Sequence, residues 1–280
     1  MHSVAAATGL TGFIGRHFLH SLLREYAFVI NYSRRGKCTL YSSKGIATHY
    51  ENSYPIHETY SPHVFYNLAT YYNSHPKDLV ELSNITDSNI VFPLKTLIGL
   101  NNPEIRIVNL CSYLQLQGKK LSGSYELSKE YFKASLENIG QEISNIFLFD
   151  TFGEKDTRNK VVDVFIRNIL DRKPITIPVT NVFINISDVL DICASLESLN
   201  RIPIGNSCVR SPFTMSLLDL ANLLMRLLGV EVEIIYDGQG ECAYSNCELL
   251  PTNIFRSANN EEISDQLLRR ANDIRNAKNI

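Results

Sequence analysis

The sequence lacks several features that would assign a chain to a common class of protein. No apolar run approaches the roughly 18 residues that a membrane-spanning helix needs, so we expect no membrane partner. The formal net charge is only -2, which gives no basis for nucleic acid as a partner. The N-terminal stretch also lacks the charged and then apolar layout of a secretory signal. We therefore expect a cytoplasmic protein.

The cysteines and histidines show no spacing that is typical of a metal site. None of the six cysteines stands in a CxxC pair, and the seven histidines are scattered along the chain. Zinc bound by Cys242 and Cys247 would need two further ligands with suitable spacing, which the sequence does not offer. We predict no metal, and we favour free thiols in a reducing compartment over disulfides.

Apolar residues, by contrast, are abundant at 44 % of the chain, enough to bury a sizeable core. Short apolar runs without alternation predict buried parallel strands at 3–7, 27–32, 63–69, 105–111 and 143–149. Apolar residues at helical spacing predict helices at 12–26, 78–100 and 122–139, the second of them bent at Pro93. After Thr151 the alternation loosens, with helices expected at 160–170 and 215–228 and short strands at 175–179, 181–186 and 230–235.

Three glycines stand on a three-residue spacing between the first predicted strand and the first predicted helix, at Gly9, Gly12 and Gly15. In a strand–turn–helix unit this spacing allows a tight turn, close approach of a pyrophosphate and close packing of the helix on the sheet. The helix N-terminus then offers unpaired N–H groups to phosphate. We predict an α/β fold of the Rossmann type, a doubly wound parallel sheet that binds a dinucleotide. Residues 1–150 would form this domain, and 151–280 a small mixed α/β lobe with some segments returning to the first.

The end of the second predicted strand bears on which dinucleotide is bound. NAD sites usually place a carboxylate there for the ribose 2′-hydroxyl. This chain has Asn31, Ser33, Arg34 and Arg35 instead, and an arginine can pair with a 2′-phosphate. The pattern favours NADP(H) over NAD(H), with solvated loop arginines as the other interpretation.

A tyrosine and a lysine four residues apart, Tyr125 and Lys129, share one face of a predicted helix, and Ser112 ends the preceding strand. A phenol has a reference pKa of about 10, and a nearby ammonium favours its ionised form. We predict that Lys129 lowers the pKa of Tyr125 towards the working range. The serine hydroxyl would hold a carbonyl or alcohol oxygen against the phenol, so the three groups suit proton transfer at an oxygen during hydride transfer.

These motifs together resemble the extended short-chain dehydrogenase/reductases of the NAD-dependent epimerase/dehydratase family. The resemblance rests on TGxxGxxG from Thr8, "NLAT" at 67–70, Ser112 and YxxxK from Tyr125, and it covers 3–196. Segments 88–95 and 148–160 look most like the branch that makes CDP-linked 3,6-dideoxyhexoses, the abequose and paratose synthases. Those enzymes reduce a 4-keto group with NADPH for lipopolysaccharide O-antigen.

The resemblance implies roles for particular residues. The catalytic residues would be Ser112, Tyr125 and Lys129. The cofactor-binding residues would be Gly9, Thr11, Gly12, Phe13, Ile14, Gly15, Asn31, Ser33, Arg34, Leu68, Ala69, Thr70, Tyr125 and Lys129. The substrate-binding residues would be Tyr71, Asn89, Ser112, Tyr113, Asp150 and Arg158. The resemblance also implies a nucleotide-sugar substrate bound by the C-terminal lobe, and a homodimer formed through the helices at 78–100 and 122–139.

The chain departs from the family pattern after the sixth predicted strand. The usual Tyr-Gly-Pro is Phe152-Gly153-Glu154, an asparagine common near the substrate phosphates is Asp150, and an arginine usual just before it is missing. These changes leave the sugar undetermined.

Three reactions of the family can be separated by sequence chemistry. Dehydration is disfavoured, because Tyr113 and Leu114 stand where the dehydratases carry an Asp-Glu pair. Reduction is favoured over 4-epimerisation, because the arginines suit NADPH, which a biosynthetic reductase consumes. A non-catalytic dinucleotide-binding protein is the third alternative, although such proteins usually lose the tyrosine or the lysine.

Overall fold

The structure is a computed structural model that describes residues 3–34, 36–51, 56–73, 75–116, 123–238 and 252–278. The chain divides into two compact units. The first consists of Met1–Leu148, Leu196–Cys208 and Leu250–Ile254, and the second of Phe149–Ser195, Val209–Leu249 and Phe255–Ile280. No helix in the described ranges has both the length and the apolar character to cross a membrane.

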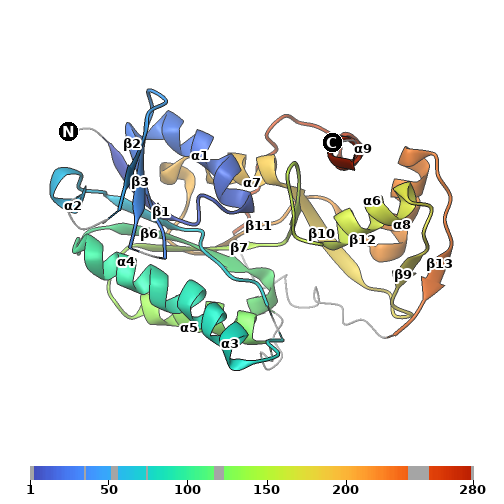
Figure 1. Ribbon diagram of the computed structural model, residues 1–280, viewed down its shortest axis with the longest axis horizontal. Coiled ribbons are helices and arrows are strands. Elements are labelled where there is room, and N and C mark those ends of the chain that lie inside the picture. The colour runs from blue at the N-terminus through green and yellow to red at the C-terminus, as the bar shows by residue number, and fades with distance from the viewer. Residues whose placement is uncertain are drawn as a thin grey trace. The chain divides into compact units, whose positions relative to one another are not determined.

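The first unit is built on an eight-stranded sheet in the order β11-β7-β6-β5-β1-β2-β3-β4 (Figure 1). Its strands are β1 (Val4–Thr8), β2 (Phe28–Tyr32), β3 (Cys38–Ser42), β4 (Ala47–Tyr50), β5 (Val64–Asn67), β6 (Arg106–Ser112), β7 (Ile143–Leu148) and β11 (Gly205–Val209). The five strands β1, β2, β5, β6 and β7 pair in parallel, which confirms the predicted doubly wound sheet. β3 and β4 add an antiparallel edge that the sequence did not predict.

Helices cover both faces of this sheet (Figure 1). Their bounds are α1 (Phe13–Glu25), α2 (Ile56–Thr59), α3 (Leu79–Thr86), α4 (Phe92–Leu100) and α5 (Ser124–Glu137), with short 3₁₀ helices at Tyr113–Leu116 and Leu199–Arg201. Phe132 and Leu136 of α5 pack with Ala6, Ile107 and Ile143 in one buried apolar cluster, so α5 lies against β1, β6 and β7 on the same face.

The helix predicted at 78–100 is three segments in one run. A π-helix, Asp87–Val91, joins α3 to α4, and Pro93 stands in the first turn of α4. Proline has no backbone N–H, so the hydrogen-bond ladder is interrupted where the predicted bend was placed. The wider π turn brings Ser88 and Asn89 to the buried side of the helix.

A row of amide side chains crosses the sheet directly above the apolar cluster. Thr8, Asn67, Asn109 and Asn145 stand at equivalent positions on four adjacent parallel strands. The Thr8 hydroxyl donates to Asn67 Oδ1 over 2.9 Å. The Nδ2 of Asn67 donates to Asn109 Oδ1, and the Nδ2 of Asn109 to Asn145 Oδ1, each over 3.0 Å. We call these four residues the amide row, and each of them is buried. At its end Asn145 Nδ2 donates to Glu137 Oε1 and Asn206 Oδ1 over 3.2 and 3.1 Å, so the buried polar groups are paired.

In the residues that the structure describes, the second unit has two small sheets and four helices (Figure 1). Its strands are β8 (Asp150–Phe152), β9 (Ile175–Ile177), β10 (Phe183–Asp188), β12 (Thr214–Ser216) and β13 (Ile234–Tyr236). Its helices are α6 (Val161–Leu170), α7 (Val189–Leu196), α8 (Leu217–Leu228) and α9 (Ile263–Lys278). Residues of α6, α8 and α9, among them Phe165, Leu224 and Leu267, share one apolar core. The helices and short strands predicted in this region are confirmed to within a few residues.

The described cysteines are buried and form no disulfide with one another. They are Cys38, Cys111, Cys193 and Cys208, whereas Cys242 and Cys247 lie outside the described residues.

Candidate active site

The glycine turn follows β1 and has the tight geometry that its spacing predicts. Gly9 has a positive φ of 80°, and a Cβ there would lie 2.5 Å from the Ala69 nitrogen. A Cβ on Gly15 would lie 2.2 Å from the Gly9 oxygen, so α1 can sit this close to the turn only without a side chain. The Gly12 nitrogen closes the turn by donating to the Gly9 oxygen over 2.9 Å.

The N-terminus of α1 fits an anionic group. The helix begins at Phe13, with Gly12 as an N-cap that makes no side-chain hydrogen bond and with no acidic residue in the first turn. Thr11 and Gly12 are exposed, whereas Phe13 is buried and Ile14 half-buried. An open helix N-terminus carries unpaired N–H groups and a positive partial charge, which suits a diphosphate. A cofactor of this kind would therefore be held by the backbone of the glycine turn.

The residues predicted to bind the adenosine part lie at the end of β2 and directly after it. Asn31 is buried, and its Oδ1 accepts from the Leu10 nitrogen over 3.2 Å, so this side chain holds the glycine turn. The Ser33 hydroxyl donates to the Lys37 oxygen. The Arg34 side chain is exposed and donates to Ser88 Oγ over 3.0 Å. Arg35, the other predicted arginine, lies outside the described residues.

The segment after β5 lies against the glycine turn. The Leu68 nitrogen donates to the Thr8 oxygen over 3.2 Å, and the Ala69 nitrogen to Thr8 Oγ1 over 3.4 Å. β1 and β5 are neighbours, and the chain order reverses between them. Parallel α/β sheets bind ligands at such a reversal, beyond the carboxyl ends of the strands. The segment therefore occupies the place where the predicted cofactor site should be.

The structure brings Ser112 and Tyr125 together. Ser112 is the last residue of β6, Tyr125 lies in the first turn of α5, and both are buried. The Tyr125 hydroxyl hydrogen-bonds to the side chains of both Ser112 and Thr70. The exposed Tyr72 ring packs against Tyr125 in a T-shaped contact, with 4.9 Å between ring centroids. Three segments that are distant in sequence thus converge on one phenol.

The pKa prediction for Tyr125 is wrong for this structure. Burial, the largest effect, raises the pKa of Tyr125 to about 12, although the hydrogen bonds from Thr70 and Ser112 lower it. The Lys129 ammonium donates to the Leu110 oxygen over 3.0 Å, and burial lowers its pKa to about 8. The phenol is therefore protonated near neutral pH, because the loss of solvent outweighs the two hydrogen bonds.

Asn89, a predicted substrate-binding residue, is engaged by the protein itself. Its Oδ1 accepts from the Tyr71 nitrogen over 2.7 Å, and its Nδ2 donates to the Tyr71 oxygen and to Ser128 Oγ over 3.2 and 2.9 Å. Asn89 thereby fixes the segment that leads from Thr70 to the helix carrying Tyr125. The Tyr71 side chain is half-buried, and its backbone is held by Asn89. Tyr113 is also half-buried and lies in the 3₁₀ turn after Ser112.

Asp150 and Arg158, the other predicted substrate residues, belong to the second unit. Asp150 opens β8 and is half-buried. Arg158 donates to Asp156 through Nε and Nη2, each over 2.8 Å, and to Thr151 through Nη2. This ion pair orders the loop before α6, a contact that the sequence did not predict. Binding of a diphosphate by Arg158 stays a prediction.

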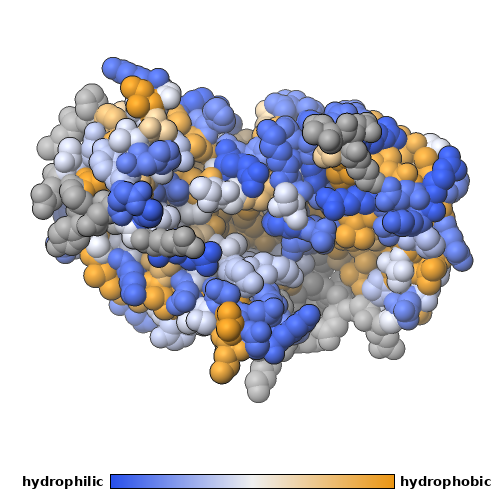
Figure 2. Space-filling view, viewed as in Figure 1, coloured by the Kyte–Doolittle hydropathy of each residue, from blue (hydrophilic) through white to orange (hydrophobic). Residues whose placement is uncertain are grey.

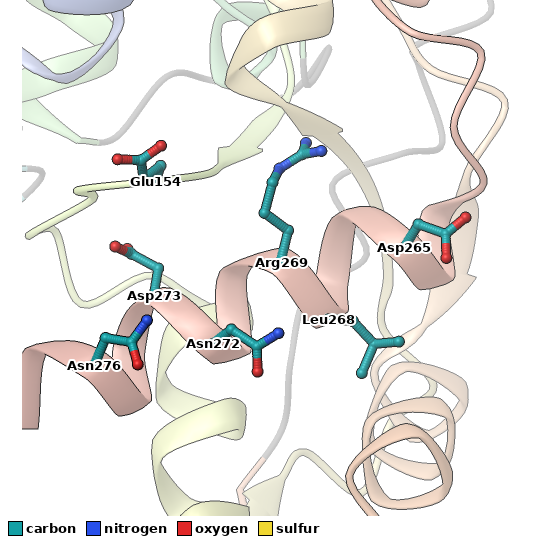
Figure 3. A pocket seen from close by; sticks show the side chains of 7 residues that line it. All are labelled: Glu154, Asp265, Leu268, Arg269, Asn272, Asp273 and Asn276. Carbon is teal, nitrogen blue, oxygen red and sulfur yellow. The ribbon is translucent and has the colours of Figure 1, made fainter.

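A hollow on the second unit lies along one side of α9 (Figure 3). It encloses about 520 Å³ and is lined by Glu154, Asp265, Leu268, Arg269, Asn272, Asp273 and Asn276. Figure 3 shows Arg269 rising from α9, and its Nη2 donates to Asp188 over 3.0 Å. Within the described residues no cluster of three histidine, cysteine, aspartate or glutamate side chains could hold a metal ion.

The sequence interpretation missed several polar residues near Ser112 and Tyr125. Gln115 and Glu130 join the 3₁₀ turn to α5, and Asn67, Asn109 and Asn145 are the asparagines of the amide row. A signal for the row was present, since an asparagine stands in each of three consecutive buried-type strands. Nothing in the spacing marked Gln115.

Comparison with known proteins finds relatives both in sequence and in fold. A family model described as the NAD dependent epimerase/dehydratase family matches residues 6–196. A CDP-abequose synthase from Yersinia pseudotuberculosis is 28% identical over 172 residues, covering 57% of this chain and 59% of that protein. The match therefore spans less than two thirds of this curated relative.

Solved structures resemble the fold over almost the whole chain. A UDP-glucose 4-epimerase from Thermotoga maritima, with UDP-glucose, has a TM-score of 0.73 at 16% identity, covering 98% of this chain and 99% of that one. A UDP-glucuronic acid 4-epimerase from Bacillus cereus, with UDP-glucuronic acid and NAD, has a TM-score of 0.72 at 16% identity and the same coverage.

Proposed function

Because the chain belongs to the NAD dependent epimerase/dehydratase family, we propose that it is an NADPH-dependent reductase of the 4-keto group of a nucleotide-linked deoxyhexose. The observation that carries the proposal is the convergence of Thr70 and Ser112 on the buried hydroxyl of Tyr125, beside a glycine turn suited to a diphosphate. When bound, a reduced nicotinamide dinucleotide supplies the hydride.

In this proposal Tyr125 is the proton donor. Reduction of a ketone to an alcohol requires a proton at the carbonyl oxygen, and a phenol with a pKa of about 12 carries that proton near neutral pH. Ser112 would orient the keto oxygen against the phenol. Lys129, fixed on the Leu110 oxygen, would hold the ribose hydroxyls of the cofactor.

The preference for NADPH over NADH rests on the residues after β2. No carboxylate stands among Tyr32, Ser33 and Arg34, and the Arg34 guanidinium is exposed while one of its nitrogens is fixed to Ser88. A fixed cation in this place would pair with a 2′-phosphate, and it would gain nothing from a 2′-hydroxyl. The similar solved 4-epimerase of Bacillus cereus contains NAD, so NADH is the competing cofactor to test.

The proposed substrate is a CDP-linked 3,6-dideoxy-4-ketohexose for lipopolysaccharide O-antigen. Its support is the similarity to a CDP-abequose synthase, together with the sequence segments at 88–95 and 148–160. The alternative is a nucleotide-sugar 4-epimerase, and two of the solved structures with a similar fold are 4-epimerases. An epimerase consumes no reduced cofactor in net, so the two can be separated by stoichiometry.

We also propose a homodimer formed through α3, α4 and α5. Large apolar side chains are exposed on all three helices, at Leu79, Val80, Leu94, Ile98, Leu127 and Tyr131. In α4 and α5 they stand four residues apart, which puts them on one face of each helix. Figure 2 shows orange atoms among blue along the lower edge, where Figure 1 places α4 and α3. Exposed apolar groups of this kind mark interaction surfaces.

The test is to mix the protein with NADPH or NADH and a panel of nucleotide-linked 4-ketosugars, and to follow nicotinamide absorbance. We expect stoichiometric NADPH oxidation with one sugar. Tyr125→Phe should lower kcat by about 10²–10⁴-fold while NADPH binding, measured by fluorescence, is unchanged. Tyr131→Phe, on the exposed face of the same helix, is the matched control and should retain activity.

Other outcomes decide between the alternatives. Interconversion of 4-hydroxy sugars without net oxidation would identify an epimerase. Cofactor binding without turnover of any sugar would identify a dinucleotide-binding protein. Arg34→Ala should reduce the preference for NADPH over NADH, whereas Lys37→Ala, an exposed cation in the same loop region, should not. Equal preference in the Arg34 variant and the wild type would refute the assigned role of Arg34.

A further inference from the structure

Gln115 connects the strand that ends in Ser112 to the helix that carries Tyr125 and Lys129. It stands in the 3₁₀ turn Tyr113–Leu116. Its Oε1 accepts from the Ser112 nitrogen over 2.8 Å, and its Nε2 donates to Glu130 Oε2 over 2.9 Å. The same side chain hydrogen-bonds to the Cys111 thiol. A single amide thus joins two of the segments that form the candidate site.

The end of β6 needs partners of this kind. β5 ends at Asn67, opposite Asn109, so β6 continues for three residues beyond its last partner on that side. Buried backbone groups at such an end are satisfied by side chains or by solvent. Here the Leu110 oxygen accepts from Lys129 Nζ, and the Ser112 nitrogen donates to Gln115. Both partners connect the strand end to α5.

The Glu130 end of the bridge is itself anchored. Glu130 follows Lys129 directly on α5, and its Oε1 accepts from Lys133 Nζ over 3.1 Å. Lys133 also donates to Glu137 over 3.3 Å, and only 12% of its side chain is exposed. Two carboxylates around one largely buried ammonium give Glu130 little freedom to move. Gln115 therefore joins Ser112 to a fixed point on α5.

We infer that Gln115 is a positioning residue, which with Glu130 sets the place of Ser112 relative to Tyr125. The inference rests on the proposed function, in which Ser112 orients the substrate oxygen. An amide suits this place because it accepts from an N–H on one side and donates to a carboxylate on the other. A glutamate at 115 would accept from Ser112 but would face the Glu130 carboxylate, and like charges at this distance repel.

The test exchanges the two side chains. In Gln115→Glu the carboxylates should move apart and displace the turn that holds Ser112. We expect kcat to fall by about tenfold to a hundredfold, since small misplacements of reacting groups have effects of this size. The affinity for NADPH should stay within about twofold of the wild type, because the glycine turn follows β1 and the Gln115 bridge joins β6 to α5. In the double variant Gln115→Glu/Glu130→Gln the amide and the carboxylate are reversed, and kcat should return to within about threefold of the wild type.

Gln141→Glu is the matched control. The Gln141 amide also bridges chain segments of the first unit, by donating to the Asn102 and Pro103 oxygens, each over 3.3 Å. It should leave kcat unchanged. Thermal unfolding of all four proteins separates misfolding from misplacement, since the single and double variants should both retain a cooperative transition.

Crystal structures of the single and double variants provide a second measurement that does not depend on turnover. The Ser112–Tyr125 hydrogen bond should be broken in Gln115→Glu and restored in the double variant. An intact bond in Gln115→Glu, or an unchanged kcat, would overturn the inference. An inactive wild type would refute the proposed function, and the crystal structures would still decide whether Gln115 positions Ser112.

Discussion

The first unit buries a row of uncharged amides, whereas the second unit buries charged pairs around its last helix. In the first unit Asn109 accepts a hydrogen bond from Asn67 and donates one to Asn145, each over 3.0 Å. In the second unit Arg270 of α9 donates from Nε and Nη2 to the two oxygens of Asp163 on α6, over 2.8 and 2.6 Å. The two units therefore satisfy the same requirement, that buried polar groups be paired, with different chemistry.

The difference follows from what each unit must hold in place. Forked Arg–Asp contacts are strong and directional, and they fasten α9 to a neighbouring helix across the apolar core. Lys129 lies close to the amide row on the same part of the sheet, since its Nζ binds the oxygen of Leu110, the residue after Asn109. A buried charge there would shift the pKa values of Lys129 and Tyr125, and neutral amides do not. The amides of the row therefore add no charge of their own beside Lys129.

The largest effect is expected where a charged pair is broken. Arg270→Met would leave the Asp163 carboxylate buried, with 1% of its side chain exposed and its forked partner removed. Removal of one member of a buried pair costs about 3–5 kcal/mol of unfolding free energy. Urea unfolding of the full chain measures it. A loss below about 1 kcal/mol would show that the pair is not buried in solution.

A smaller loss is expected where the amide row is interrupted. Asn109→Leu fills the space but leaves Asn67 Nδ2 and Asn145 Oδ1 without this partner. Unpaired buried polar groups cost about 1–3 kcal/mol each, and the apolar leucine offsets part of this cost, so we expect a loss of about 2–4 kcal/mol in urea unfolding. Asn138→Leu, at the exposed end of α5, is the control and should change stability by less than about 1 kcal/mol. If Asn109→Leu loses no more unfolding free energy than this control, the amide row does not stabilise the first unit.

The parallel part of the first unit could be predicted because its signals are local. Apolar runs without alternation located β1, β2, β5, β6 and β7, and the glycine spacing located the turn whose close contacts the structure shows. The antiparallel strands β3 and β4 were missed because they are polar and partly exposed, with no apolar run to mark them. β3 forms by pairing with β2 and β4 by pairing with β3, and the periodicity of the sequence does not show which strand is at the edge.

The proximity of Ser112 and Tyr125 could be predicted from the sequence, whereas the pKa of Tyr125 could not. Helical spacing placed Tyr125 and Lys129 on one face, and the strand end placed Ser112 nearby. Burial cannot be read from that spacing, and it is burial that raises the pKa of Tyr125. The amide row and the Gln115 bridge depend on strand register and on a turn conformation, which are set by the whole sheet.

Lys129 provides a test of how a buried positive charge affects the stability of the first unit. Its pKa is about 8 in the folded protein, against an ordinary value of 10.5. Between these values the unfolded chain binds more protons, so the contribution of Lys129 to stability should increase as pH rises from about 8 to about 10. Relative to Lys129→Met, the wild type should gain about 2 kcal/mol of unfolding free energy over that range, measured by urea unfolding. A constant difference would mean that Lys129 is paired with an anion, as the arginines of α9 are.

The smallest effect is expected at an exposed ion pair of the first unit, Arg24 with Glu197. Arg24 Nε donates to Glu197 Oε1 over 2.9 Å, but 64% of the arginine side chain is exposed. Solvent screens such a pair, so Arg24→Met should lower the unfolding free energy by less than about 1 kcal/mol. The difference from wild type should also vanish in about 1 M NaCl, where the screening length falls to roughly 3 Å. The loss in Arg270→Met should persist in the same salt, since Asp163 stays buried. Equal salt dependence of the two losses would show that solvent screens the Arg270–Asp163 pair as strongly as it screens the Arg24–Glu197 pair.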